Sequence, residues 1–433
     1  MGISWAKTKL TVSVTALAIV LSGCTSGTSQ DPQSDPVGDG DDGTTLTMWA
    51  RSATEPTSSL LVERYNSTHK NQVKLTIIPN ENYQPRVGAA AGADNLPDIL
   101  VSQTGYVPSY TKNGLWIDIS DRIDALPYAK DIAPSHLKVS SIDGKNFGVP
   151  YLVDLSLMLY NKDLFKQAGL DPEDPPSDFA ELLDAARATN ALSDQISGFY
   201  MAGNCGSCNS FTMFPYAWAD GVDVFSDDGT KANFDNETFR KIFALYKTAW
   251  DEGLMPRNAE TDDGSTWADG FVQGRTAIQA LGTFAIAELK KESNFDWGVI
   301  QLMSPDGGAA STFVGGDVAG ISRSSKSPDA AWNFIEWTLS EDAQIEVLAK
   351  NGLLPTRTDL TDNEYTSEDP RVKLVADTVA LGHTPFVIAL GEVINSANGP
   401  WLAMIRGAIF GDDPDSAIVK GQQQIQAGLD ATK

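Results

Sequence analysis

Apolar positions along the chain fall into short runs that are separated by longer amphipathic segments. Residues 45–49 and 97–101 are short apolar runs typical of buried strands, and residues 73–78 alternate between apolar and polar side chains. Residues 60–69 repeat apolar side chains at helical spacing, and residues 83–91 form a helical segment rich in small side chains. Short buried strands separated by helices predict a parallel sheet that is covered on both faces.

The same alternation recurs further along the chain. Residues 148–160 form a long extended segment, and residues 178–189 begin with an aspartate that is suited to cap a helix. The segments 239–252, 330–339 and 341–349 repeat apolar side chains at helical spacing and are predicted to be amphipathic helices. The chain is therefore predicted to belong to the α/β class.

The N-terminus follows a different pattern. Lys7 and Lys9 precede an apolar run at residues 10–21, which has the length of the hydrophobic part of a signal peptide and is too short to span a membrane. The run ends in LSGC at residues 21–24, and small residues directly before a cysteine resemble the lipobox of bacterial lipoproteins. We therefore expect Cys24 to be lipidated, with a buried structural cysteine as the alternative.

This pattern predicts a signal peptide at residues 1–23 and a flexible tether at residues 24–43, where Ser, Thr, Gly, Pro and Asp predominate. The predicted location is the extracytoplasmic side of the cell membrane, to which the lipid anchor alone attaches the protein. About 390 of the 433 residues follow the tether. A segment of that length is too long for one ordinary core and favours two domains.

The excess of acidic residues limits the classes of molecule that this protein is expected to bind. The chain has 32 basic and 57 acidic residues. Nucleic acid is not expected as a partner, because phosphate binding needs clusters of Lys and Arg and the sequence contains none. His69, His136 and His383 are scattered, so no metal site is predicted. No phosphate-binding loop or nucleophile motif occurs either, and neither a cofactor nor an enzymatic activity is expected.

Cys205 and Cys208 form a Cys-Gly-Ser-Cys motif. In an exported protein this spacing favours a small disulfide over half of a zinc site. A thioredoxin-type redox role is a weaker alternative. It requires the first cysteine at the N-terminus of a helix after a buried strand, and here a glycine-containing stretch precedes the motif.

Several motifs follow one another in a fixed order after the tether. They are GVPYLVDLSLMLYNKDLF at residues 148–165, GGDVAGIS at 315–322, SPDAAW at 327–332 and GLLPTR at 352–357. In this order and spacing they resemble the family-1 extracellular solute-binding proteins, which include the maltose-type receptors of ABC sugar importers. The resemblance implies a two-lobed periplasmic-binding-protein fold of type II. Each lobe then has a mixed sheet flanked by helices, and the ligand occupies the cleft between the lobes.

By motif order, one lobe is placed at residues 44–152 plus 315–353 and the other at residues 153–314 plus 356–433. The resemblance implies a monomeric binding protein that captures a carbohydrate, such as a di- or oligosaccharide, and delivers it to the permease subunits of an ABC importer. The alternatives are a receptor for a polyol or a glycerol-phosphate-type ligand, a glycoside-processing lipoprotein and an adhesive surface lipoprotein.

A sugar presents many hydroxyls and a weakly apolar C–H face, so its receptors combine aromatic rings with planar polar side chains. Candidates are expected in loops after strands, where open α/β sheets place their ligands, and at the segments that cross between lobes. The predicted ligand-binding residues are Trp49, Arg51, Glu55, Tyr83, Gln103, Tyr151, Asp154, Trp218, Asp220, Phe284, Gly315, Gly316, Asp317, Arg357 and Trp401.

Some of these candidates have competing structural interpretations. Asp154 lies among apolar neighbours, and burying a carboxylate there requires hydrogen bonds from a ligand, from backbone amides or from an arginine. Gly315 and Gly316 allow the backbone to approach either a ligand or a packed strand. Trp218 can belong to a hydrophobic helix that packs on a core, and Arg357 can form a salt bridge between the lobes.

Overall fold

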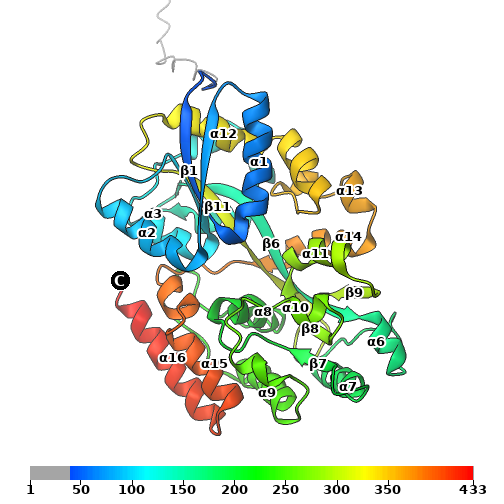
Figure 1. The fold of residues 1–433 in the computed structure, drawn as a ribbon. Helices are drawn as coiled ribbons and strands as arrows, with labels where there is room; N and C mark the ends of the chain where they lie inside the picture. Colours follow the sequence, from blue (N-terminus) through cyan, green and yellow to red (C-terminus); the bar gives the residue numbers. More distant parts are fainter. Residues whose placement is uncertain (1–39, 433) are drawn as a thin grey trace, which may run out of the picture. The chain divides into compact units, whose positions relative to one another are not determined.

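The structure is a computed structural model that describes residues 40–432 (Figure 1). The predicted signal peptide at residues 1–23, the lipidation of Cys24 and most of the predicted tether lie outside the described residues. Among residues 40–432, no helix is both long enough and apolar enough to cross a membrane.

The described residues form a ten-stranded sheet and a separate two-stranded one. The strands are β1 (Thr45–Arg51), β2 (Gln72–Ile78), β3 (Ile99–Gln103), β4 (Ser141–Ile142), β5 (Lys145–Asn146), β6 (Val149–Asn161), β7 (Ser197–Tyr200), β8 (Thr276–Gly282), β9 (Trp297–Ile300), β10 (Leu302–Met303), β11 (Ala310–Ile321) and β12 (Gly382–His383). The main path of the large sheet is β2-β1-β3-β11-β6-β8-β7.

The large sheet is mixed. β1 pairs in parallel with β2 and β3, and β7 pairs in parallel with β8. The long strands β6 and β11 are antiparallel to each other and to their other neighbours on this path. The parallel arrangement indicated by the alternating pattern is not kept at the centre, where β6 and β11 run in opposite directions. The mixed sheet that the family resemblance implies is confirmed.

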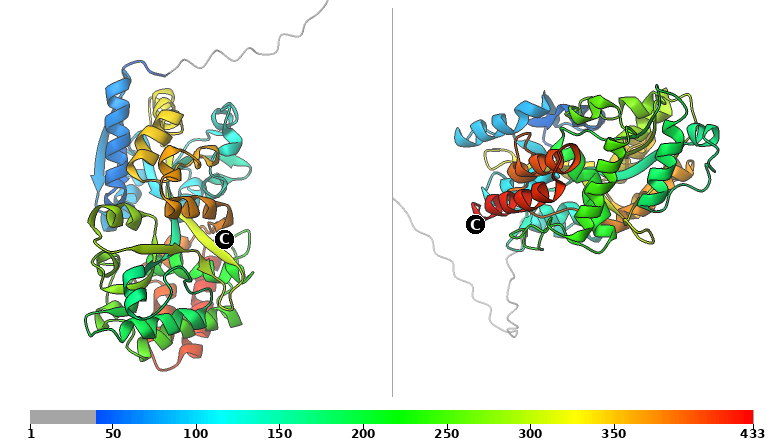
Figure 2. Two further views of the ribbon diagram at one scale, coloured as in Figure 1. Left: turned by 90° about the vertical axis from the view of Figure 1, so that its right-hand side faces the viewer. Right: turned by 90° about the horizontal axis from the view of Figure 1, so that it is seen from below.

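Helices cover the sheet. They are α1 (Glu55–Thr68), α2 (Asn80–Gly92), α3 (Val107–Lys112), α4 (Ser120–Asp124), α5 (Pro134–Val139), α6 (Lys162–Gln167), α7 (Phe179–Asn190), α8 (Gly206–Ala219), α9 (Glu237–Asp251), α10 (Asp269–Val272), α11 (Phe284–Glu292), α12 (Pro328–Thr338), α13 (Glu364–Ser367), α14 (Pro370–Thr378), α15 (Pro400–Ile405) and α16 (Pro414–Asp430). Figure 2 shows α15 and α16, in orange to red, packed beside each other.

Local sequence signals account for several helix boundaries. The side chain of Asn161 accepts hydrogen bonds from the first amides of α6, and that of Asp178 caps α7 in the same way. The cap at Asp178 confirms the sequence prediction. The predicted helix at residues 341–349 is present, but its main part, Asp342–Leu348, is a π-helix and its end is a short 3₁₀ turn.

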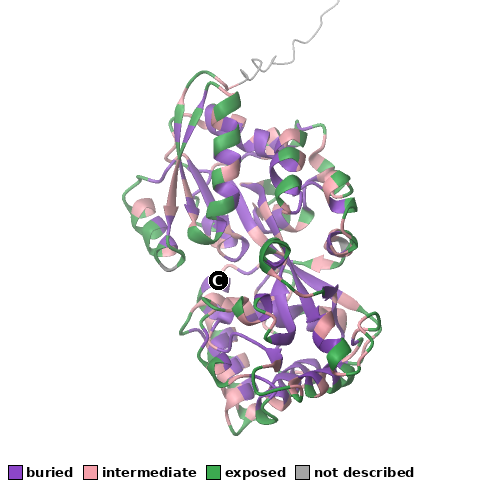
Figure 3. Cartoon of the chain, turned by 45° about the vertical axis from the view of Figure 1, so that its right-hand side comes forward, coloured by how far each residue is buried: buried purple, intermediate pink, exposed green. Residues whose placement is uncertain are grey.

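The buried apolar residues form separate hydrophobic cores. Figure 3 shows the buried residues, in purple, concentrated along the strands of the large sheet. One core gathers around β1, α1 and α12, and another around α8, α9, α15 and α16. Strand β6 contributes Tyr151 to the first core and Tyr160 to the second, and β11 contributes Ile321 to the first and Phe313 to the second. These two strands therefore connect the cores. The lobe boundaries predicted within them stay a prediction.

Candidate functional site

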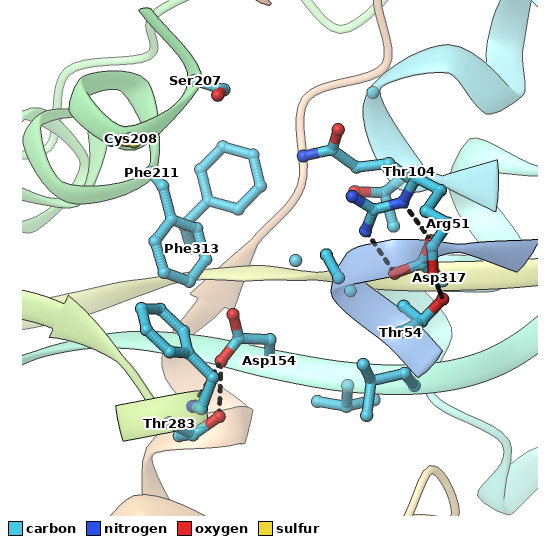
Figure 4. Close-up of a pocket in the computed structure, with 18 of the residues that line it drawn as sticks. Arg51, Thr54, Thr104, Asp154, Ser207, Cys208, Phe211, Thr283, Phe313 and Asp317 are labelled. Carbon is cyan, nitrogen blue, oxygen red and sulfur yellow. Dashed lines mark hydrogen bonds and ion pairs between the residues drawn. The ribbon is translucent and has the colours of Figure 1, made fainter. Parts of the chain in front are cut away.

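A cavity of about 470 Å³ lies over the middle of β6 and β11 (Figure 4). The ends of β1 and β3 contribute to it, as do the start of α11 and the N-terminal part of α8. The loop at residues 352–354 and the ends of the segment 390–395, most of which is a π-helix, contribute further lining residues. A volume of this size falls within the range usual for sites that bind small molecules.

One side of the cavity carries a buried ion pair. The guanidinium of Arg51, at the end of β1, donates from Nε and from its second nitrogen to the two carboxylate oxygens of Asp317 on β11, at 3.0 and 2.8 Å. The side chains are 15% and 1% exposed. Burial by itself lowers the pKa of Arg51, but the charge and hydrogen bonds of Asp317 outweigh it and raise that pKa. Two hydrogen bonds therefore hold the guanidinium of Arg51 against Asp317.

Asp154 on β6 is the second carboxylate of the cavity. Its Oδ1 accepts hydrogen bonds from the hydroxyl of Thr283 at 2.6 Å and from the amide of Phe284 at 3.3 Å. Its other oxygen is directed into the cavity (Figure 4). Burial raises the pKa of Asp154 to about 6, although its hydrogen-bond donors act in the opposite direction.

The opposite side of the cavity is an aromatic wall made of Phe211, Trp267, Phe284 and Phe313. The ring centres of Phe211 lie 5.5 Å from Phe313 and 6.5 Å from Trp267, and Trp267 lies 5.7 Å from Phe284. Phe284 is 43% exposed, which is unusual for a large apolar side chain. The cavity therefore combines a polar side with an aromatic one.

Two glycines of β11 allow these elements to approach closely. Gly316 has φ +110°, and a Cβ there would lie 1.9 Å from the carbonyl oxygen of Leu152 on β6. A Cβ on Gly315 would lie 3.0 Å from the ring of Phe211. Gly316 therefore requires glycine for packing, and Gly315 brings the backbone of β11 close to the ring of Phe211, whether or not a ligand approaches the backbone there.

A disulfide joins Cys205 and Cys208, whose Cα atoms are 5.3 Å apart. Cys205 is the N-cap of α8, a few residues after β7, and Cys208 lines the cavity. The expectation that the glycine-containing stretch keeps the first cysteine away from a helix N-terminus is wrong. The chain turns directly from that stretch into the helix.

Seven of the predicted ligand-binding residues line the cavity together. They are Arg51, Gln103, Asp154, Phe284, Gly315, Gly316 and Asp317.

Four further predicted residues, Trp49, Glu55, Tyr83 and Tyr151, do not line the cavity. Trp49 stacks against Arg86, whose guanidinium carbon is 4.5 Å from the ring centre. The buried Tyr83 donates its hydroxyl to the carbonyl of Val101 at 2.6 Å. Tyr151 is 1% exposed within the core, and Glu55 is exposed at the start of α1. Strand alternation places Trp49 on the face of β1 opposite Met48 and Ala50. The sequence alone could not show whether that face is directed toward the cavity or away from it.

Two further predicted residues, at the end of α8, do not line the cavity. Trp218 stacks on His383 with ring centres 5.1 Å apart, and Asp220 accepts hydrogen bonds from Thr238 and Ser304.

Trp401 is fully buried in the second core and donates its indole N–H to the carbonyl of Gly206. Arg357 pairs with its neighbour Asp359 and lies 3.9 Å from the ring centre of Tyr128. Neither residue lines the cavity. Each has partners within the protein that already satisfy its polar groups.

Sequence reasoning missed Phe211, Trp267, Phe313 and Asn395, which line the cavity. Phe313 lies two and four residues before Gly315 and Asp317, so strand alternation could have placed it on the same face. Phe211 lies one helical turn after Ser207, which also lines the cavity, and that spacing was a usable signal. Trp267 lies in an irregular segment, where no periodicity marks the side that faces a ligand, and Asn395 ends a single-turn π-helix, Gly391–Asn395.

A family profile described as bacterial extracellular solute-binding protein matches residues 61–373. The chain belongs to this family. The resemblance drawn from the motifs is thereby confirmed.

Curated relatives support the same placement. A putative binding protein of Brucella abortus (strain 2308) is 26% identical over 231 residues, which are 53% of this chain and 55% of the relative. This chain thus spans about half the length of that relative. The diacetylchitobiose-binding protein DasA of Streptomyces coelicolor is 23% identical over 94% of both chains.

Solved structures share the fold. A solute-binding protein from Thermotoga lettingae bound with α-D-tagatose has a TM-score of 0.79 at 22% identity and covers 89% of this chain and 100% of its own. A cyclic α-maltosyl-1,6-maltose-binding protein from Arthrobacter globiformis has a TM-score of 0.75 at 24% identity, with 90% and 99% covered. The predicted fold class, a two-lobed α/β fold of the periplasmic-binding-protein type, is confirmed.

Proposed function

We propose that this protein binds a carbohydrate, in the size range of a di- or oligosaccharide, and delivers it unchanged to the permease of an ABC importer. The observation that carries the proposal is the aromatic wall opposite the polar side of one cavity. Aromatic rings pack against the C–H face of a sugar, and the polar groups orient its hydroxyls. The sugar specificities of the maltotriose-binding protein of Pyrococcus abyssi and of DasA agree with this class of ligand.

Within the cavity we assign separate roles to the polar and the aromatic side chains. Asp154 accepts hydrogen bonds from sugar hydroxyls with the oxygen that is directed into the cavity, and Gln103 and Asn395 provide amides that both donate and accept. Trp267 and Phe284 stack on the sugar and exclude water from these hydrogen bonds. Arg51 and Asp317 form a rigid polar edge, since each already holds the other.

The same geometry argues against a glycosidase. That chemistry needs one carboxyl group as the acid and a second as the base or nucleophile. Asp317 is 1% exposed and engaged by Arg51, so Asp154 is left as the accessible carboxylate of the two.

A glycerol-phosphate-type ligand is disfavoured for a related reason. A phosphate requires basic side chains that are free to pair with it. Arg51 is the one basic residue among the described residues that line the cavity, and Asp317 already binds its guanidinium with two hydrogen bonds. A polyol lacks this charge, and a solute-binding protein from Agrobacterium radiobacter in complex with ribitol has the same fold, with a TM-score of 0.76. Polyols therefore belong in the same test as sugars.

We further propose that Cys24 carries the lipid anchor and that the protein acts as a monomer on the extracytoplasmic side of the membrane. The lipobox-like LSGC at residues 21–24 supports the anchor, and the extracellular placement of the family supports the location.

A thermal-unfolding screen tests the proposed function. The panel contains mono-, di- and trisaccharides, polyols and glycerol phosphodiesters. A ligand at a hundred times its Kd adds about 2.7 kcal/mol of stability, so one sugar class should raise the Tm clearly. Recovery of the same sugar after incubation, checked by chromatography, separates binding from hydrolysis. A panel without any shift contradicts carbohydrate binding, and a shift with the phosphodiesters alone favours the alternative ligand.

A further inference from the structure

The Cys205–Cys208 disulfide lies where two walls of the cavity meet. Cys208 lines the cavity, and the sulfur of Cys205 accepts a hydrogen bond from the amide of Cys208 at 3.1 Å in the first turn of α8. Phe211 of the aromatic wall is on the next turn of this helix. The disulfide thus links the N-cap of α8 to its first turn, and this helix carries Phe211 into the wall of the cavity.

The loop before Trp267 packs directly on this disulfide. Gly264 has φ +97°, and a Cβ there would lie 2.8 Å from the sulfur of Cys208 and 3.0 Å from that of Cys205. There is no space between this backbone and the two sulfurs. Any movement of the sulfurs toward Gly264 must therefore displace the loop that leads into Trp267.

Asp262 holds the rest of the loop against the segment before α8. The carbonyl of Asp262 accepts from the amide of Asn204 at 2.9 Å. Its carboxylate accepts from the hydroxyl of Tyr200 at 2.7 Å and from the amide of Gly264 at 2.9 Å. The loop and the helix N-terminus therefore form one connected unit with the disulfide between them.

We propose that the Cys205–Cys208 disulfide positions Phe211 and Trp267 for ligand binding, so that its reduction weakens binding and bound ligand protects it from reduction. This inference rests on the proposed function in that the ligand is a sugar. Two thiols need van der Waals separation, which is larger than a sulfur–sulfur bond. Because Gly264 already contacts both sulfurs, that separation shifts either the helix N-terminus or the loop, and the two rings lose their alignment.

The reductant is a dithiol. One of its thiolates attacks the sulfur of Cys208, which the cavity makes accessible, and Cys205 leaves as a thiolate that takes a proton from water. The N-terminus of α8 and the amide of Cys208 stabilise that thiolate. The second thiolate of the reductant then attacks the mixed disulfide and releases Cys208. Two electrons pass from the dithiol, which becomes a disulfide, to the protein.

Binding and redox state are reciprocally linked. If reduction weakens sugar binding by a given factor, saturating sugar must stabilise the oxidised form by the same factor. A tenfold difference in Kd corresponds to a shift of about 30 mV in the reduction potential of this two-electron couple.

The experiment compares the oxidised chain, the chain reduced with dithiothreitol and the reoxidised chain, using a sugar identified by the thermal screen. Mass spectrometry of the peptide with both cysteines verifies each redox state. We expect the Kd from calorimetry to rise about tenfold on reduction and to return on reoxidation. Saturating sugar should shift the thiol–disulfide equilibrium with dithiothreitol toward the oxidised chain by the same factor. An unchanged Kd in the verified dithiol state overturns the proposal.

The double variant Cys205→Ser/Cys208→Ser is the matched control. It should bind as weakly as the reduced chain and show no response to dithiothreitol. Binding as tight as that of the oxidised chain contradicts the positioning role. If this variant does not fold, the reversible comparison on the native chain decides the question by itself.

A second measurement needs no ligand and separates this proposal from the proposed function. Hydrogen exchange of the oxidised and reduced chains should show faster exchange after reduction in residues 206–211 and 262–267, with α16 unchanged. Equal exchange in both states overturns the positioning role. A panel without any binding sugar, together with faster exchange in these segments, refutes only the proposed function.

Discussion

Arg51 and Asp317 face each other across the sheet and form a bidentate ion pair between the end of β1 and β11, with Asp317 almost completely buried. The two residues are far apart in the sequence. β3 lies between their strands, and Asp317 is paired in register with Gln103 of β3. The pair therefore connects β1 directly to a strand that runs between the two hydrophobic cores.

Removing one partner of this ion pair should lower the free energy of unfolding. Asp317→Asn leaves the guanidinium of Arg51 uncompensated in a poorly solvated place, and we expect a loss of about 3 kcal/mol in the free energy of unfolding. Urea unfolding at neutral pH measures it. The matched control is Asp342→Asn, which breaks the surface pair with Arg64, whose side chains are 37% and 46% exposed. That control should change stability by less than about 1 kcal/mol, and equal losses in both variants would contradict the assignment.

The titration of Asp154 should be visible in the pH dependence of stability. Burial raises the pKa of Asp154 from its ordinary 3.8 to about 6, so the folded state favours the neutral form. The favourable contribution of Asp154 to the free energy of unfolding is fully present below pH 3.8 and is lost as the pH rises to about 6. The free energy of unfolding of the native chain, relative to that of Asp154→Asn, should fall over this window because the asparagine does not titrate. A constant difference between pH 4 and 7 would count against the raised pKa.

The same carboxylate should make ligand binding depend on pH in the opposite sense. A charged carboxylate accepts stronger hydrogen bonds from hydroxyls than a neutral carboxyl group does. We expect the Kd for a sugar to rise as the pH falls below 6. Asp154→Asn should bind weakly and without this pH dependence. Calorimetric titrations at pH 5 and 7.5 measure both effects, and a pH-independent native Kd would exclude Asp154 from the contact.

Substitutions of Trp267 and Trp218 should differ in their effect on ligand binding. Trp267→Ala removes a ring of the aromatic wall and should weaken sugar binding by about 1–2 kcal/mol, which is roughly a 5- to 30-fold increase in Kd. Trp218→Ala is the matched control, because Trp218 packs on Phe313 and His383 outside the cavity. The comparison uses variants whose circular dichroism is native. A larger loss for Trp218→Ala than for Trp267→Ala would refute the assigned site.

Glycine at position 316 should be essential for stability. Gly316→Ala forces a side chain into positive φ and against the carbonyl of Leu152, so we expect a loss of at least about 2 kcal/mol. Gly88→Ala is the control, because Gly88 lies in α2 with open space around it. That variant should gain about 0.5–1 kcal/mol, since alanine lowers the entropy cost of forming a helix. Urea unfolding of both variants provides the comparison.

Short-range patterns were sufficient for most elements. The strands β1, β2, β3 and β6 and the helices α1, α7, α9 and α12 follow from periodicity and caps, because both depend on neighbours within a few residues. The family followed from the order of motifs, since each motif marks a turn, cap or crossing that the fold repeats. The centre of the sheet did not follow, because the direction of β6 relative to β11 depends on pairing between residues far apart in the sequence.

Some residues of the candidate site could likewise be identified from the sequence, and others only from the tertiary structure. The sequence alone identified Asp154, Gly315 and Gly316 as candidate site residues. A carboxylate or a glycine in a buried strand lowers stability unless its surroundings supply hydrogen bonds or require close backbone approach. Only the tertiary structure decided that Trp401 belongs to a core while Trp267 faces the cavity. The physical reason is that a tryptophan is equally suited to a core and to an aromatic wall. The side it faces is set by packing between distant segments, on which its sequence neighbours carry no information.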